Sequence, residues 1–182
     1  KSQDVKSLIF VSALAIDKSP KSFYAGTKLE AEESIKKIFK NTTIIRPSVI
    51  YGPEDNFTNK FAKMAAVSPF IPLINKGITK FQPISVLDVA KAIEKVVIYQ
   101  DFQGITYNIG GPEVFSFKEI LDLILNNIEK KKIYINLSFF NAKILALMTY
   151  YFPNSPITLD QLRLLEVDNI VPPNSKGLKD LG

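Results

Sequence analysis

A strand, a helix and a second strand follow one another near the start of this chain, and this succession restricts the fold more than any other feature. The apolar run from Leu8 to Val11 predicts a short strand within residues 5–12 that is buried on both faces. Residues 22–40 have the apolar spacing of a helix, and residues 42–46 predict another strand. Strands joined by a helix through short connections are typical of a parallel crossover unit. We therefore predict an α/β fold built on a parallel sheet.

The same kinds of pattern predict the remaining elements. The helix at 22–40 is expected to bury Leu29, Ile35, Ile38 and Phe39 and to pair Glu32 with Lys36. After it we expect a loop at 48–56, a helix at 57–67 begun by Asp55 or Asn56, a strand at 81–86, a helix at 87–99 with Val89, Ile93, Val96 and Val97 inward, and a strand at 104–109. Capping boxes open the last two predicted helices: Ser116 and Glu119 open one, and Thr158 and Gln161 open the helix at 159–167. We expect one α/β unit, residues 1–137, and a helical tail, residues 138–182.

The composition excludes several kinds of catalytic chemistry. The chain has no His and no Cys, so it cannot form a Ser-His-Asp triad, a thiolate nucleophile, a disulfide or an ordinary zinc site. Proton transfer is left to Tyr, Lys, Asp and Glu. The net charge of +5 comes almost entirely from Lys, which reads bases and clamps phosphates less well than Arg. We therefore expect no nucleic-acid partner and no metal.

Hydropathy bears on where the chain resides. No stretch reaches the roughly 18 apolar residues that a membrane span requires, and no leader-like apolar region follows the first residues. These features predict an intracellular protein. The segment 138–152 is nevertheless apolar on all sides, with Lys143 as its single charge. It is interpreted either as a core-packing helix or as a docking surface for a membrane-associated partner.

Tyr24 and Lys28 are one helical turn apart, so their side chains share a face of the first helix. Such a pair arises readily by chance in a chain with 7 Tyr and so many Lys. Its place is more informative, because it follows a buried strand that ends at Ser12, at the edge where open α/β sheets bind their ligands. The alternative is that Tyr24 is a half-buried aromatic residue and Lys28 a surface cation.

Several motifs occur here in a characteristic order. They are Phe10-Val11-Ser12-Ala13, Tyr24-Ala25-Gly26-Thr27-Lys28, Arg46-Pro47-Ser48-Val49-Ile50-Tyr51-Gly52-Pro53, Val86-Leu87-Asp88-Val89-Ala90 and Tyr107-Asn108-Ile109-Gly110-Gly111-Pro112. Together they resemble the second half of an extended or atypical short-chain dehydrogenase/reductase, of the kind related to NAD-dependent epimerases and dehydratases. The resemblance implies the C-terminal half of a Rossmann-type sheet with a small substrate-side subdomain, so that residues 1–137 would form a partial NAD(P)-binding domain.

The resemblance also implies roles for particular residues. Tyr24 would be the acid/base, Lys28 would hold the nicotinamide ribose and favour the phenolate, and Ser12 would orient the substrate oxygen. Pro47, Ser48 and Val49 would line the nicotinamide of a bound NAD or NADP, beside a small-molecule substrate. A neighbouring ammonium favours the charged phenolate, so we expect the pKa of Tyr24 to fall from its usual value of about 10.

Two further positions of the family pattern are less specific. Asp88 matches a position that is structural in relatives, where it would cap or pair near the substrate loop. Arg46 ends a strand, and it could hold a phosphate or pair with an acid. Both interpretations of Arg46 remain open at this point.

One branch of the superfamily is more similar than the others. The segments 52–57 and 160–165, followed by Asp168-Asn169, resemble the nucleotide-binding accessory subunit of respiratory complex I and its bacterial relatives. This branch implies a respiratory-complex partner and a place in the cytoplasm, or in the mitochondrial matrix of a eukaryote, peripheral to the inner membrane. The chain would then be either an NAD(P)-dependent oxidoreductase or epimerase, or a non-catalytic binding and assembly protein.

The chain departs from the family in its glycines. The family's dinucleotide site begins with a glycine-rich turn whose backbone amides hold the pyrophosphate. The 8 glycines of this chain have no trio with that spacing. This departure predicts that the chain is a truncated form of the family. Its partner would then be a separate N-terminal half, or the chain would be an inactive gene fragment.

We predict that the 182-residue chain alone binds neither NADH nor NADPH measurably. The residues that would meet the nicotinamide are present, but anionic phosphates need backbone amides to replace their lost water. Calorimetric titration of the purified chain with each dinucleotide is the measurement. Micromolar binding of either one would contradict the prediction.

Overall fold

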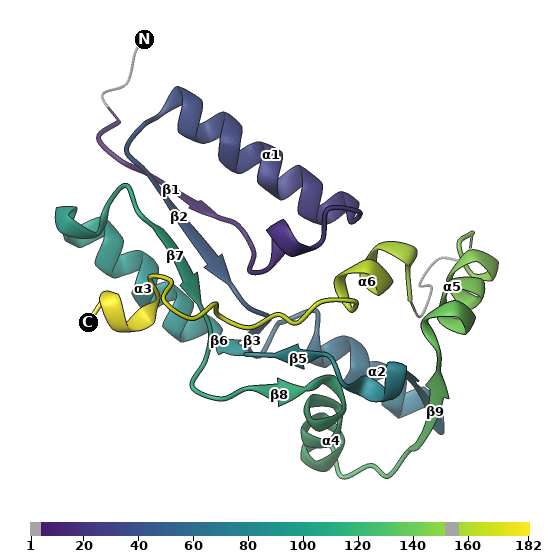
Figure 1. Ribbon diagram of the computed structural model, residues 1–182. Helices are drawn as coiled ribbons and strands as arrows, with labels where there is room; N and C mark the ends of the chain where they lie inside the picture. The colour runs from purple at the N-terminus through teal and green to yellow at the C-terminus, as the bar shows by residue number, and fades with distance from the viewer. Residues whose placement is uncertain (1–4, 152–156) are drawn as a thin grey trace.

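The computed structural model describes residues 5–151 and 157–182, and it is organised around a three-stranded parallel sheet (Figure 1). The sheet order is β1 (Leu8–Val11), β2 (Thr42–Pro47), β7 (Thr106–Ile109), with β2 in the middle. Helices α1 (Phe23–Ile38) and α3 (Val86–Ile98) lie on opposite sides of this sheet. The predicted α/β fold with a parallel crossover is therefore confirmed.

Helix α1 begins where the sequence predicts, and the predicted inward residues Leu29, Ile35 and Phe39 are partly buried. Its N-cap is Ser22, whose side chain accepts a hydrogen bond from Ala25 N. Ala25 and Glu32 are the buried residues of the helix, whereas Ile38 is 86% exposed. The prediction that Ile38 is buried was wrong, because Ile38 ends the helix on the side away from Ala25 and Glu32.

The predicted pair of Glu32 with Lys36 was also wrong. Glu32 binds Arg46 instead, and Lys36 Nζ donates to Thr106 Oγ1 at 3.2 Å. A salt bridge between exposed neighbours on one helix is weak, so a tertiary partner with better geometry displaces it.

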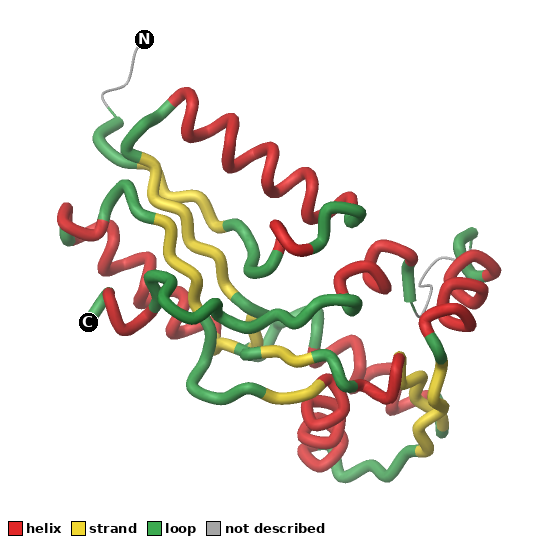
Figure 2. Tube along the Cα trace, in the orientation of Figure 1, coloured by secondary structure: helices red, strands yellow, loops and turns green. Residues whose placement is uncertain are grey.

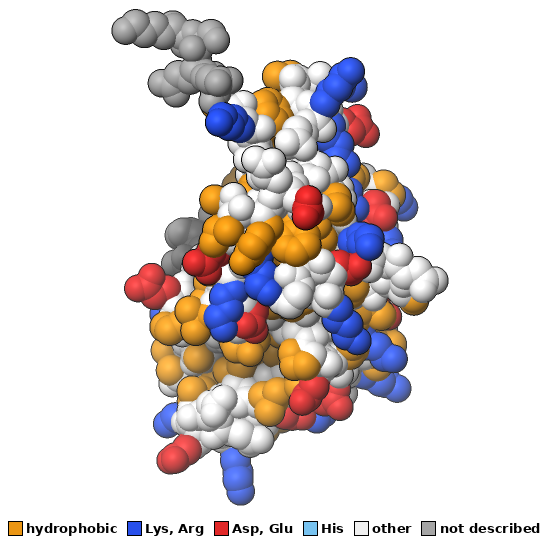
Figure 3. Space-filling view, turned by 90° about the vertical axis from the view of Figure 1, so that its left-hand side faces the viewer, with side chains coloured by type: hydrophobic (Ala, Val, Ile, Leu, Met, Phe, Trp, Pro, Cys, Tyr) orange, Lys and Arg blue, Asp and Glu red, His pale blue; other side chains and the backbone are white. Residues whose placement is uncertain are grey.

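Helix α3 packs on the other side of the sheet through Val89, Ala92 and Val96. Ile93 is partly buried, as expected. Val97 is 61% exposed, so its predicted inward position was wrong; the neighbouring Val96 is the residue that faces the sheet. The side of the molecule that carries α3 shows apolar side chains among basic and acidic ones (Figure 3).

Residues beyond the sheet form a second region around three helices and a strand pair. Its elements are α2 (Thr58–Val67), β4 (Phe70–Ile74), α4 (Phe117–Asn127), β9 (Ile133–Leu137) and α5 (Phe139–Met148). Strands β4 and β9 pair in parallel, and the sequence patterns had predicted neither of them. The aromatic rings of Phe57, Phe61, Phe81 and Phe117 pack together with their centroids 5.3 to 6.3 Å apart where these elements meet.

Short strands connect the two regions. They are β3 (Ile50–Tyr51), which pairs with β6 (Ile84–Ser85), and β5 (Lys80–Phe81), which pairs with β8 (Phe115–Ser116). The single strand predicted at 81–86 is thus two strands, since Pro83 between them has no N–H for a ladder. The loop predicted at 48–56 contains β3. Asp55, one of two predicted helix starters, accepts hydrogen bonds from Thr58 ahead of α2.

Both predicted capping boxes are present. Ser116 and Glu119 open α4, and Thr158 and Gln161 open α6 (Leu159–Leu164). In each box a side-chain oxygen of the cap residue accepts the N–H three residues on, and the longer side chain accepts the cap's own N–H. These local signals depend on few residues, which explains why the sequence alone reveals them.

The end of the chain is extended and returns along the sheet edge, as the trace from α6 toward the C-terminus shows (Figure 2). Asn169 N donates to Lys80 O at 2.7 Å, and Asn108 N donates to Lys176 O at 2.8 Å. A 3-10 helix, Leu178–Asp180, follows. Helices α5 and α6 agree with the predicted helical tail, but the last residues are held by backbone bonds to other strands. The domain division after residue 137 stays a prediction.

Helix α5 is apolar on all sides but only half covered. Ala142 and Ala146 pack in the core, whereas Phe140 and Met148 are 71% and 72% exposed. Phe152, which belongs to the apolar segment noted in the sequence, lies outside the described residues. No helix in the described parts of the chain is long and apolar enough to cross a membrane.

Candidate active site

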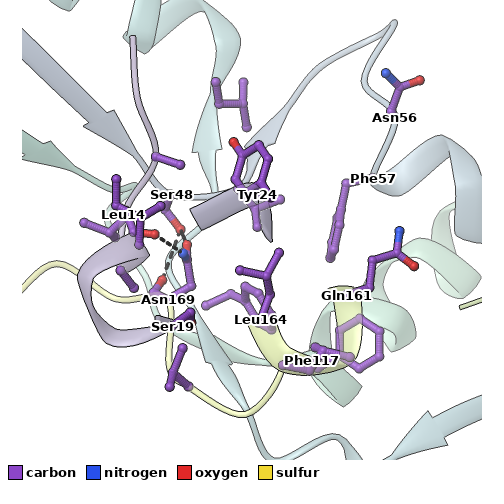
Figure 4. Close-up of a pocket in the computed structure, with 18 of the residues that line it drawn as sticks. Leu14, Ser19, Tyr24, Ser48, Asn56, Phe57, Phe117, Gln161, Leu164 and Asn169 are labelled. Atoms are coloured by element: carbon purple, nitrogen blue, oxygen red, sulfur yellow. Dashed lines mark hydrogen bonds between the residues drawn. The ribbon is translucent and has the colours of Figure 1, made fainter. Parts of the chain in front are cut away.

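A cavity of about 550 Å³ opens at the carboxyl ends of β1 and β2, between α1, α2 and α6 (Figure 4). Six residues were singled out in the sequence, and all of them line this cavity: Ser12, Tyr24, Lys28, Pro47, Ser48 and Val49. Parallel strands end at one edge of a sheet, so residues far apart in sequence meet there. The structure therefore brings the sequence-predicted residues to one site, while their roles remain to be tested.

Tyr24 and Lys28 lie one turn apart on α1, but their side chains have different surroundings. The Tyr24 side chain is half-exposed, and its hydroxyl makes no hydrogen bond to any described residue. Lys28 Nζ donates to Val11 O at 3.1 Å and lies 5.3 Å from the centroid of the Phe10 ring. Burial raises the pKa of Tyr24 above its usual value. The expected lowering was wrong, because Lys28 is held by Val11 and Phe10.

Ser12 is buried at the end of β1, with 4% of its surface exposed. Its hydroxyl has no hydrogen bond of normal geometry among the described residues. It lies close enough to the Glu32 carboxylate to help lower the pKa of that group. Ser12 thus lines the cavity, but its hydroxyl oxygen is buried in the protein behind the cavity wall.

Ser48 connects the cavity to the C-terminal segment. Its hydroxyl donates to Asn169, lying 2.6 Å from the side-chain oxygen and 3.1 Å from the backbone oxygen. Asn169 Nδ2 in turn donates to Leu14 O at 3.0 Å (Figure 4). Sequence reasoning assigned no site role to Asn169, although the pair Asp168-Asn169 belongs to the motif that resembles complex I relatives.

Behind the cavity, Glu32 and Arg46 form a bidentate ion pair. Arg46 Nε donates to Glu32 Oε1 at 2.8 Å, and Arg46 Nη2 donates to Oε2 at 2.6 Å. The Glu32 side chain is 4% exposed. Burial works to raise the pKa of Glu32, but the hydrogen bonds from Arg46, the nearby hydroxyl of Ser12 and the positive charges of Arg46 and Lys36 together outweigh it, and the pKa is lowered. Of the two interpretations open for Arg46, the structure selects the one in which it pairs with an acid.

Asp88 lies on the first turn of α3, away from the cavity lining. Its carboxylate is 4.0 Å from Lys91 Nζ, and both side chains are exposed. The N-cap of α3 is Ser85 rather than Asp88. Asp88 therefore makes a weak surface pair beside a helix start where negative charge is favourable.

Asp160 on α6 holds the start of α1, which carries Tyr24. Its carboxylate accepts hydrogen bonds from Phe23 N at 2.7 Å, Ser22 Oγ at 3.0 Å and Tyr24 N at 3.1 Å. Burial works to raise the pKa of Asp160, but these bonds lower it. The position was part of a recognised motif, but nothing in the sequence pointed to this contact across more than a hundred residues.

We predict that Asp160→Ala destabilises the fold by about 1 to 2 kcal/mol, because free N–H groups at a helix start lose their acceptor. The lowered pKa means that this contribution is present above the unfolded pKa of Asp and is lost as the pH falls through the folded pKa. Urea unfolding at neutral and acid pH measures both effects. Asp88→Ala, which removes an exposed acid from a first turn, is the matched control. Equal losses for the two variants at neutral pH would contradict the prediction.

No group of three or more acidic side chains in residues 5–151 and 157–182 is arranged to hold a metal ion. The ionisable groups that line the cavity are Tyr24, Lys28 and Lys60. Among these, a hydroxyl with a raised pKa and two ammonium groups can supply protons and positive charge. The site is therefore suited to donating a proton to an oxygen atom.

Sequence comparison finds relatives along most of the chain. A family model described as the RmlD substrate binding domain matches residues 15–155. The chain is 35% identical over 185 residues to the mitochondrial NADH dehydrogenase (ubiquinone) 1 alpha subcomplex subunit 9 of Arabidopsis thaliana, covering 95% of this chain and 46% of that protein. It is 28% identical over 184 residues to the mitochondrial NADH-ubiquinone oxidoreductase 40 kDa subunit of Neurospora crassa, covering 98% and 47%. The chain spans about half the length of the curated relatives it matches.

Solved structures share the fold. The UDP-glucuronic acid 4-epimerase of Bacillus cereus, in complex with UDP-glucuronic acid and NAD, superposes with a TM-score of 0.63 at 20% identity. The match covers 75% of this chain and 50% of the epimerase chain. The resemblance noted from the motifs, to the Rossmann-type fold of the epimerases and to the complex I accessory subunits, is confirmed.

Proposed function

This chain belongs to the family of the RmlD substrate binding domain, and from that premise we propose that it carries the proton-transfer site of an NAD(P)-dependent short-chain dehydrogenase/reductase. The observation that supports this most is the Tyr24 hydroxyl, which lies beside the cavity one helical turn from the Lys28 ammonium and makes no hydrogen bond to any described residue. In this proposal Tyr24 exchanges a proton with the substrate oxygen and Lys28 assists, whereas the buried hydroxyl of Ser12 does not touch the substrate.

The state of Tyr24 favours one direction of proton transfer. Tyr24 is protonated at neutral pH, and in this proposal it gives its proton to a carbonyl oxygen as negative charge develops there; burial, which raises the pKa of Tyr24, keeps the hydroxyl protonated until then. The reaction supported is the reduction of a carbonyl to an alcohol. A nicotinamide dinucleotide, when bound, supplies the hydride to the carbonyl carbon.

The residues around the cavity fit the nicotinamide and ribose end of such a dinucleotide. Lys28 gives one of its three donors to Val11 O, which leaves two for ribose hydroxyls. Pro47 and Val49 add apolar surface, and the Ser48 hydroxyl is already bound to Asn169. NAD is present in the solved epimerase structure, and either NAD or NADP is compatible with these residues.

A second function is favoured by the relatives. Two of them are named as mitochondrial NADH dehydrogenase or oxidoreductase subunits. Under this alternative the chain is a non-catalytic binding and assembly protein of a respiratory NADH:ubiquinone oxidoreductase, located in the matrix or cytoplasm at the inner membrane. The exposed apolar side of α5 would then be a surface available to a partner.

The experiment that separates the two functions compares the intact protein with its Tyr24→Phe variant. Oxidation of NADH and NADPH is measured with carbonyl substrates, and the amount of assembled respiratory complex is measured in cells. Catalysis predicts loss of turnover with normal assembly. If there is no turnover to lose and assembly depends on the chain, the assembly function replaces the catalytic one.

A further inference from the structure

We propose that the cavity beside Tyr24 binds an elongated apolar substrate with a single carbonyl, and does not bind a nucleotide sugar. This inference rests on the proposed reduction at Tyr24 and adds the substrate class. It follows from which side chains form the interior of the cavity and from how its polar groups are occupied.

The interior is built from apolar side chains of several elements. They include Leu14 before α1, Phe57, Phe61 and Met64 at α2, Phe117 on α4 and Leu164 on α6. Leu164 belongs to none of the buried core clusters, so its side chain is not needed to fill them. In Figure 4, Phe57, Phe117 and Leu164 lie on the same side of the Tyr24 ring. A ligand that fills this space would bury mostly carbon against carbon.

Several polar groups in the wall are occupied or covered, whereas the side chains of Asn56 and Tyr24 and the side-chain amide nitrogen of Gln161 make no hydrogen bond to any described residue. Ser48, Asn169 and the Leu14 carbonyl bind one another. The oxygens of Ser12 and Ser19 are buried below the surface of the wall, so a ligand cannot reach them. The side chains of Asn56, Tyr24 and Gln161 are fewer than the hydroxyls of a sugar, so several sugar hydroxyls placed here would lose water without gaining a partner, which is unfavourable for each of them.

A nucleotide sugar also carries a diphosphate, which Arg side chains recognise best. The two Arg of this chain, Arg46 and Arg163, are paired with Glu32 and Asp160. The cations that line the cavity are Lys28, which is bound to Val11 O, and Lys60. Lys60 has no partner among the described residues and Lys28 keeps two donors, but two lysines act as point charges and hold two phosphates less firmly than the fork of an Arg does.

The test is fluorescence titration of the chain with N-phenyl-naphthylamine, a neutral apolar probe. We expect it to bind, to be displaced by the methyl ketone undecanone, and to remain bound when UDP-glucose is added. Leu164→Asp should weaken probe binding at least tenfold, because a carboxylate in an apolar space must keep its water. Leu164→Met should restore it, since volume and polarity are nearly kept.

Leu87→Asp is the matched control, because Leu87 is 68% exposed on α3 and does not line the cavity. It should bind the probe like the unaltered chain, and circular dichroism should show all variants folded. Displacement of the probe by UDP-glucose, or equal binding by Leu164→Asp and Leu87→Asp, would overturn the proposed substrate class.

The probe experiment distinguishes a failure of the proposed substrate class from a failure of the proposed reduction. Tyr24→Phe should bind the probe normally, because a phenyl ring fills the same space. If the probe results hold and the intact protein shows no turnover that depends on Tyr24, the reduction is wrong and the apolar site stands. If turnover depends on Tyr24 but the probe results fail, the substrate class alone is wrong.

Discussion

In the intact protein, meaning a version extended to the full length of its relatives, replacing Tyr24 with Phe is expected to lower carbonyl reduction about 10²- to 10⁴-fold, the usual contribution of a positioned acid. The affinity for the dinucleotide should stay nearly unchanged, because only one hydroxyl is removed. That hydroxyl makes no hydrogen bond to any described residue, so the fold should not weaken. Steady-state kinetics and calorimetric titration measure the two quantities.

The pH profile gives a second measure of the role of Tyr24. Because its pKa is raised, the acid form prevails through neutral pH, and activity should decline only in the alkaline range. Tyr51→Phe is a suitable control, since Tyr51 is 44% exposed and does not line this cavity. Equal losses of binding and turnover in Tyr24→Phe would indicate a packing role instead.

Replacing Arg46 with Ala is expected to destabilise the protein by about 3 to 5 kcal/mol at neutral pH, because it leaves the carboxylate of Glu32 buried and unpaired. The pair joins α1 to β2 directly behind the cavity, so the loss should also loosen the helix that carries Tyr24. Denaturant unfolding at neutral pH measures the free energy of unfolding.

Acid pH should reduce the difference between this variant and the unaltered protein. In the unaltered protein the pKa of Glu32 is lowered, so its contribution is present above the unfolded pKa and is lost as the pH falls through the folded one. In Arg46→Ala burial, which raises the pKa of Glu32 and is the largest influence on it, is opposed only by Ser12 and Lys36, so we expect the folded variant to take up a proton and to gain relative stability as the pH falls.

Two comparisons keep the Arg46 prediction specific. Lys143→Ala breaks an exposed pair with Glu166 at 3.4 Å and should cost less than about 1 kcal/mol. Combining Arg46→Met with Glu32→Leu should recover most of the lost stability, since no charge is then buried. If Arg46→Ala costs no more than Lys143→Ala, the pair is not a major part of the fold.

The fold class and most helices could be predicted because their signals are local. The capping boxes of α4 and α6 each depend on two side chains three residues apart. The strands β1 and β2 stand out as short apolar runs, and a helix between them implies parallel pairing. The candidate site was predictable for a related reason, since Ser12 and Ser48 both follow strands that end at the same edge.

Other features needed contacts that no local pattern contains. Strands β4 and β9 are short, and they become a sheet only by pairing with each other across some sixty residues. The exposure of Ile38 and Val97 depends on which face of each helix meets the sheet.

The sequence by itself thus determined an α/β chain with a tyrosine and a lysine at the ligand-binding edge of a parallel sheet. Periodicity and caps encode single elements, and elements of this kind assemble in few ways. The tertiary structure alone decided that Arg46 binds Glu32, that Lys28 turns to Val11, and that Asp160 and Asn169 hold α1 and Ser48 across 137 and 121 residues. Hydrogen bonds act over about 3 Å, so their partners exist only after distant segments have packed together.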